Sequence, residues 1–176
     1  MSNVYDITKY VASLDPAQEV SVSVWDEVTD PMCSAMGDLR EQACAGVFVQ
    51  VAVDVGPHAE TGFLKWCQER HPESAPTCFD STGVALSVSG RTQNWPVRKV
   101  AQEMKEVCST AREEGLLLAC WAGLGNGLTQ RGLGNEEAAA EACGVFAEFL
   151  PSRQAEEACV MSRTQLTSGA LLEMNY

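Results

Sequence analysis

The sequence predicts an α+β domain in which helices pack on a mostly antiparallel sheet of about four strands. Three observations lead to this fold class. Valines occupy every second position of 46–55, which places all five on one face of a strand because side chains alternate along an extended chain. A similar alternation recurs at 19–26, and apolar residues follow a helical spacing through 96–114. An apolar strand face must be covered, so strands and helices are expected to share one core.

The first third of the chain contains two of the predicted strands. A short helix near its start ends at Asp15-Pro16. The strand at 19–26 follows, and Asp30-Pro31 then begins a helix over 31–44, since proline suits a first helical turn. Gly46 closes that helix, and the valine strand at 46–55 comes directly after it.

The region 56–82 is predicted to be an insertion between strands. Its first part, 59–70, favours a short helix that stops before Pro72. Its second part, 72–82, is rich in Pro, Ser and Thr and is typical of a loop. A metal ion would help to hold an insertion with so few apolar residues.

The second half of the chain alternates strands and helices. Valine and leucine alternate at 83–89, which predicts a third strand, and the helix at 96–114 is expected to end at Gly115. The apolar run at 116–121 predicts a buried fourth strand, with an extension of the helix as the alternative. A Gly-rich loop at 122–134 and a helix that begins at Asn135 follow.

The order of these elements is that of a split-βαβ, ferredoxin-like core with extra helices at both ends. We expect residues 1–176 to form a single domain, because 176 residues are enough for one proper core. This architecture says little about function, since it supports many unrelated activities.

The eight cysteines are expected to be mostly reduced. None forms a C-x-x-C pair, and several occupy apolar positions of predicted helices, where a thiol acts as a small buried hydrophobe. The N-terminal residues lack the pattern of a secretory signal, and no apolar run approaches the roughly 20 residues that span a bilayer. These observations predict a cytoplasmic protein without a membrane segment; a disulfide framework is the alternative.

Charge is distributed unevenly along the chain, whose net value is −12. Residues 1–60 hold ten acidic and two basic side chains, and residues 132–176 hold seven and two. The middle, 61–131, holds seven and eight and is therefore balanced. Direct binding of nucleic acid is not expected, because it requires lysines and arginines for the phosphates.

Two motifs could bind a ligand or take part in catalysis. The Gly-rich loop repeats Gly-Leu-Gly-Asn, but its spacing is not that of a dinucleotide fingerprint, and Glu136 and Glu137 would repel a phosphate. The insertion holds both histidines and two cysteines, which are zinc-ligand types: His58, Cys67, His71 and Cys78. Cys67 and His71 could instead form a nucleophilic pair oriented by Asp80 or Asp54.

The function that we predict from the sequence is binding. An acidic protein of this kind would meet the basic surface of a protein or nucleoprotein complex, as a phage or mobile-element inhibitor such as an anti-CRISPR does. The expected contact residues are five carboxylates around one strand end and the next helix: Asp26, Glu27, Asp30, Asp38 and Glu41. The alternative is a small enzyme or metal-binding protein that uses the four residues of the insertion, and solubility alone could also explain the charge.

Overall fold

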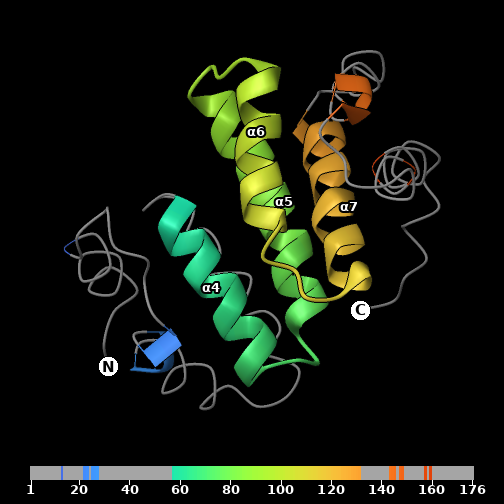
Figure 1. Cartoon of the computed structure of the whole chain (residues 1–176). Coiled ribbons are helices and arrows are strands. Elements are labelled where there is room, and N and C mark those ends of the chain that lie inside the picture. Colours follow the sequence, from blue (N-terminus) through green and yellow to red (C-terminus); the bar gives the residue numbers. More distant parts are fainter. Residues whose placement is uncertain are drawn as a thin grey trace. The chain divides into compact units, whose positions relative to one another are not determined.

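The computed structural model describes residues 57–131 as one continuous stretch (Figure 1). It also describes a few positions outside this stretch, namely 13, 22, 23, 25–27, 143–145, 147, 148, 157 and 159. The chain divides into two compact units, Met1–Cys78 and Phe79–Tyr176, and each is described by itself. The four long helices among the described residues are α4 (Pro57–Arg70), α5 (Ala75–Thr92), α6 (Val97–Cys108) and α7 (Glu114–Arg131).

The α+β prediction is wrong for the part of the chain that the structure describes, which is helical and contains no strand. The strand predicted at 83–89 lies inside α5, and the one predicted at 116–121 lies inside α7. The alternative for 116–121, an extension of the preceding helix, was right about the helical backbone, but α7 is a separate helix that begins after the turn at 109–113. Where a strand was expected at 19–26, the described positions 22, 23, 25 and 26 are helical. The valine strand at 46–55 lies outside the described residues.

The error in α5 has a physical cause. All residues from Ala85 to Gly90 are buried, so this part of the helix is covered nearly all round. A helix buried on every side needs no 3.6-residue stripe, and its apolar run cannot be told from a buried strand by periodicity. The alternation of Val84, Leu86 and Val88 therefore carries no information about the backbone.

Helix α4 confirms the prediction of a helix over 59–70 and begins two residues earlier. Pro57 is its first residue, a position where proline's missing N–H costs nothing. The loop predicted at 72–82 is wrong from residue 75 onward, because α5 begins at Ala75. The backbone N–H of Cys78 donates to the Ser74 carbonyl (3.1 Å), and Pro76 fits the first turn, whose N–H groups lack helical acceptors.

Helix α6 confirms a helix within 96–114 but ends at Cys108. The buried side of this helix consists of Val100, Ala101, Met104, Val107 and Cys108. The chain turns at 109–113, where the Ser109 hydroxyl donates to the Glu106 carbonyl (2.6 Å). Gly115 consequently lies in the first turn of α7 and does not terminate a helix.

Glycines allow α5 and α7 to approach each other closely. A Cβ atom built on Gly83 would lie 2.7 Å from the Leu124 nitrogen, and one on Gly123 would lie 2.6 Å from the Asp80 carbonyl carbon. Gly127 contacts the Ser87 side chain in the same way. Gly125 lies against the backbone of Cys159. The Gly-rich loop predicted at 122–134 is therefore wrong for 122–131, which belong to α7; 132–134 lie outside the described residues.

The prediction of reduced cysteines is wrong. All six cysteines that the structure describes are joined in disulfides: Cys67–Cys78, Cys108–Cys120 and Cys143–Cys159. The burial of Cys108 and Cys143, at apolar positions of predicted helices, is confirmed, but burial does not distinguish a thiol from a disulfide. The first bridge closes the turn between α4 and α5, and the second closes the turn between α6 and α7. Cys33 and Cys44 lie outside the described residues.

None of the described helices has the length and apolar character needed to cross a membrane.

Candidate functional site

The structure brings three of the four predicted metal ligands to the turn between α4 and α5. Cys67 and Cys78 are bonded to each other, and the His71 ring packs on Trp66 with 4.6 Å between ring centroids. His58 lies in the first turn of α4, at the other end of that helix. A disulfide sulfur is not a thiolate, so Cys67 and Cys78 cannot bind zinc or attack a substrate while the chain is oxidised. The described residues contain no group of side chains placed to hold a metal ion.

Asp26, one of the five predicted contact residues, is held inside its own unit. Two nitrogens of Arg70 donate to its carboxylate, Nε to Oδ1 at 3.1 Å and Nη2 to Oδ2 at 2.8 Å. The Trp66 indole N–H also donates to Oδ1, at 3.0 Å. Hydrogen bonding by Arg70 is the main reason that the pKa of Asp26 lies below its usual value. Asp26 therefore fastens its own segment to α4.

Glu27 is exposed beside Asp26, which makes it the described member of the predicted set that faces solvent. Asp30, Asp38 and Glu41 lie outside the described residues. Adjacent helical residues point about 100° apart, so Trp25 can be buried while Asp26 reaches sideways and Glu27 faces water. In a strand, Trp25 and Glu27 would lie on the same face. The helical backbone at 25–27 instead allows Trp25 to be buried while Glu27 is exposed.

Sequence reasoning missed the aromatic cluster beside Asp26, whose member Trp66 donates to the Asp26 carboxylate. Trp25 meets Phe63 edge to face with ring centroids 5.2 Å apart, and Phe63 stacks on Trp66 at 5.6 Å. All three rings are 1% exposed or less. No local signal identifies this cluster, because Trp25 and Trp66 are far apart in sequence. The sequence predicted the helix over 59–70 but not the contacts that its aromatic side chains make.

A second polar contact lies between α5 and α7. The Asn126 side-chain nitrogen donates to Asp80 Oδ1 at 3.2 Å, next to the close approach at Gly123. Burial raises the pKa of Asp80, and the hydrogen bond from Asn126 acts in the opposite direction. Asp80 was one candidate to orient a Cys67–His71 pair, and the hydrogen-bond partner that it has in the structure is an amide on α7.

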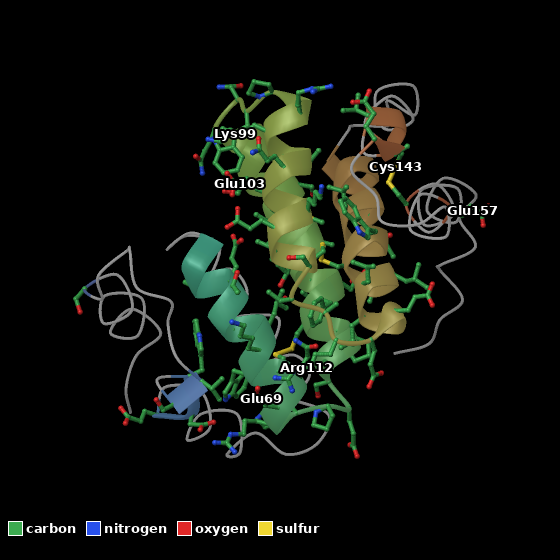
Figure 2. All side chains as sticks on the ribbon, viewed as in Figure 1. Glu69, Lys99, Glu103, Arg112, Cys143 and Glu157 are labelled. Atoms are coloured by element: carbon green, nitrogen blue, oxygen red, sulfur yellow. A yellow bond between two sulfur atoms is a disulfide. The ribbon has the colours of Figure 1, made fainter. Side chains whose placement is uncertain are left out.

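The turn between α5 and α6 presents a partly exposed aromatic residue. The Lys99 ammonium lies 4.0 Å from the centre of the Trp95 ring, a cation–π contact, and Figure 2 shows Lys99 and Glu103 on the same part of α6. Arg98 pairs with Glu148 at 2.8 Å, but both side chains are more than 60% exposed. Such an exposed pair contributes little to stability.

The described side chains thus form anchoring contacts and exposed charges, and their cysteines are joined to one another. Comparison with known proteins gives no further assignment: the chain matches no protein-family model, no curated protein and no solved structure.

Proposed function

We propose that this chain acts by binding a partner that presents a basic surface. The observation that carries the proposal is the net charge of −12, concentrated in residues 1–60 and 132–176. A strong field of one sign accelerates the encounter with an oppositely charged surface and disfavours wrong partners.

We place this binding in an oxidising compartment. A cytoplasmic protein was expected because the N-terminal residues lack a secretory signal pattern, and reduced cysteines were expected with it; the three disulfides contradict the reduced cysteines. Disulfides form and persist mainly outside the reducing cytoplasm. An inhibitor of the anti-CRISPR kind works in a reducing cytoplasm, so the disulfides give no support to that narrower version of the proposal.

The disulfides also favour binding through a preformed surface. Two of them close the turns between consecutive helices, which limits the conformations of α4–α5 and of α6–α7 before a partner binds. A surface that is already ordered loses less conformational entropy on association. The network around Asp26 fixes the backbone next to Glu27 in the same way. Glu27 is therefore the described residue that we propose for direct contact.

The test is capture of a partner by the oxidised chain. Immobilised protein is exposed to extracellular or periplasmic extract, and bound proteins are eluted between about 50 and 500 mM salt, where screening weakens contacts between exposed charges. We expect a basic protein that is released as salt rises and that binds Glu27→Lys less well. Glu106→Lys is the matched control, because Glu106 is exposed on α6 and the charge change is the same.

Two results would contradict the proposal. One is the absence of any captured basic protein. The other is a captured protein whose binding is the same at every salt concentration and in both charge-reversed variants. Equal weakening by Glu27→Lys and Glu106→Lys would support a general electrostatic attraction and remove Glu27 as the specific contact.

The alternative, a metal-binding protein or small enzyme at His58, Cys67, His71 and Cys78, stays a prediction for the reduced chain. Its two cysteines become available only when their bond is broken. Zinc binding measured before and after reduction by a dithiol distinguishes the two states. Binding of one zinc ion by the reduced chain, lost on alanine replacement of His71, would favour this alternative.

A further inference from the structure

The turn between α5 and α6 carries positive charge in a chain that is otherwise acidic. Residues 81–102 contain three basic side chains and no acidic one, whereas the whole chain has a net charge of −12. Arg98 and Lys99 lie exposed in the first turn of α6, and the partly exposed Trp95 precedes them. Tryptophan and arginine are enriched where proteins bind one another. These three residues, Trp95, Arg98 and Lys99, are called the basic turn below.

The backbone restricts the position of Trp95. Its N–H donates to the Gly90 carbonyl at 2.7 Å, and Asn94 between them has a φ of 54°, which is the geometry that closes many helices at a left-handed residue. The ring lies close to Gly90, since a Cβ atom built there would be 3.4 Å from its edge. The Lys99 ammonium lies 4.0 Å from the ring centre. Indole and ammonium are therefore arranged before a ligand binds, which lowers the entropy lost on association.

The basic turn already binds a carboxylate from a distant part of the sequence. Arg98 Nη2 donates to Glu148 Oε2 at 2.8 Å, across a separation of 50 residues. The two side chains are 68% and 62% exposed, so water competes for both and the pair is weak. The contact identifies the kind of group that Arg98 accepts, and its weakness allows another carboxylate to take the place of Glu148.

We propose that the basic turn is a docking site for a short acidic peptide segment of another protein, which displaces Glu148 from Arg98. Carboxylates of the segment pair with Arg98 and Lys99, and an apolar side chain beside them packs on the Trp95 indole. Charges further away than about 8 Å are largely screened at physiological ionic strength, so a short segment is influenced mainly by the basic turn.

A longer polyanion fits this surface less well. Nucleic acid binds through many phosphate contacts, and the basic turn offers two exposed cations. A nucleic acid or an anionic membrane would also extend beyond the turn and meet the charge of a chain whose net value is −12. Two cations and one ring instead match a few residues of a peptide.

A neighbouring carboxylate limits the surface along α6. Glu103 follows Lys99 by one helical turn and lies on the same part of the helix (Figure 2). It repels a carboxylate placed beyond Lys99, so the acidic residues of the segment are expected on the side of Trp95. The basic turn is opposite in charge to the acidic ends of the chain. The segment therefore belongs to a different partner from the basic one proposed above.

The test measures the affinity of a defined peptide for the oxidised chain. The probe is a short fluorescent peptide in which glutamate and leucine alternate, and the same peptide with glutamine in place of glutamate is its control. Fluorescence anisotropy is measured at about 150 mM salt. We expect wild type to bind the glutamate peptide and to bind the glutamine peptide less well.

Charge reversal at Lys99 tests the surface itself. Lys99→Glu should weaken binding of the glutamate peptide by about tenfold or more, because an attraction becomes a repulsion. The variant should fold, since glutamate is favourable in a first helical turn. Lys105→Glu is the matched control, because Lys105 is exposed on α6 outside the basic turn and the charge change is the same. It should weaken binding by no more than about twofold, since that charge is largely screened.

Two further comparisons separate docking from a structural role. Glu148→Gln removes the internal carboxylate and should raise the affinity by up to about fivefold, which corresponds to the strength of an exposed ion pair. Replacing leucine by glycine in the peptide should weaken its binding to wild type but not to Trp95→Ala, because only wild type has the indole on which leucine packs. Both comparisons cancel a general loss of folded protein.

Several results would overturn the proposal. One is that the glutamate peptide does not bind, or binds no better than the glutamine peptide. Another is equal affinity in wild type and Lys99→Glu, or an affinity that Glu148→Gln leaves unchanged. Tighter binding of a single-stranded oligonucleotide or of anionic lipid vesicles than of the acidic peptide would assign the basic turn to that ligand and would also overturn it.

Discussion

The unit Met1–Cys78 and the unit Phe79–Tyr176 are held together in different ways. In the first, large side chains meet: Trp25, Phe63 and Trp66 pack ring on ring, and Arg70 clamps Asp26 beside them. In the second, side chains are absent at the closest point, and Gly83, Gly123 and Gly127 let two helices touch through their backbones. Removing side-chain atoms should therefore destabilise the first contact, whereas adding side-chain atoms should destabilise the second.

The two units also treat their partly buried acid groups differently. The hydrogen bond from Arg70 lowers the pKa of Asp26, whereas the partial burial of Asp80 raises its pKa more than the Asn126 amide lowers it. Acid therefore weakens the contact in the first unit and strengthens the one in the second. The difference teaches that net charge alone does not predict how an acidic chain responds to pH. The groups around each carboxylate decide whether acid stabilises or destabilises its contact.

The largest effect is expected from emptying the aromatic cluster of the first unit. Phe63→Ala removes the ring between Trp25 and Trp66 and should cost about 3–5 kcal/mol of unfolding free energy, as truncation of buried aromatic residues usually does. Urea denaturation followed by tryptophan fluorescence measures this. Glu73→Ala, at an exposed position of the following turn, is the control and should change stability by less than about 0.5 kcal/mol. Equal effects would show that the rings do not hold this unit together.

The next largest effect is expected from removing a disulfide, a type of bond that each unit contains. Replacing Cys108 and Cys120 together by alanine should cost about 2–4 kcal/mol, because the bridge restricts the unfolded chain. The Cys67–Cys78 bridge closes a loop of nearly the same length, so replacing both of its cysteines by alanine should cost a similar amount. Urea midpoints of the two variants test this. A much larger loss in one of them would mean that its unit depends on the bridge for native packing as well.

Gly123→Ala tests the glycine contact of the second unit directly. The added methyl group would meet the Asp80 backbone, so we expect a loss of about 1–3 kcal/mol despite alanine's better helix propensity. Gly115→Ala in the same helix is the control: nothing lies within 4 Å of its added Cβ, and it should be neutral or stabilising by up to about 1 kcal/mol. Thermal unfolding by circular dichroism compares them. Stabilisation by both substitutions would contradict a close backbone contact.

The smallest effect is expected at the Asp26–Arg70 pair. Arg70 is 53% exposed, so Asp26→Asn should cost no more than about 1 kcal/mol at neutral pH. The pKa of Asp26 is lowered, so its contribution is present above pH 3.8 and is lost as the pH falls through the pKa of the folded state. Urea midpoints between pH 2 and 7 should fall less steeply with acid for Asp26→Asn than for wild type. Parallel curves would mean that the pair does not contribute to acid sensitivity.

Local patterns in the sequence predicted some of these elements. The helix within 96–114 was found because it has one buried side and one wet side, and a 3.6-residue stripe records that difference. Helix α4 is buried along most of its length, and it was placed from the helix stop at Pro72. The strands at 83–89 and 116–121 were wrong because those helices contain apolar runs without such a stripe. Cys67, His71 and Cys78 were grouped with His58 because all four are zinc-ligand residue types in one segment, and the bond between Cys67 and Cys78 was not predicted.

The sequence by itself determined the charge, the burial of Cys108 and Cys143 and the amphipathic helix α6, because each depends only on composition or on residues one or two turns apart. Only the tertiary structure decided that Asp26 meets Arg70 and Trp66, that Asp80 meets Asn126, and that the glycines of α7 face α5 and Cys159. These partners lie 34 to 46 residues apart in sequence (159 − 125 = 34 for Gly125 and Cys159), and no local pattern encodes a contact at that separation. A glycine leaves the same mark in a sequence whether it serves a flexible loop or two backbones in contact, since what distinguishes them is the atom opposite.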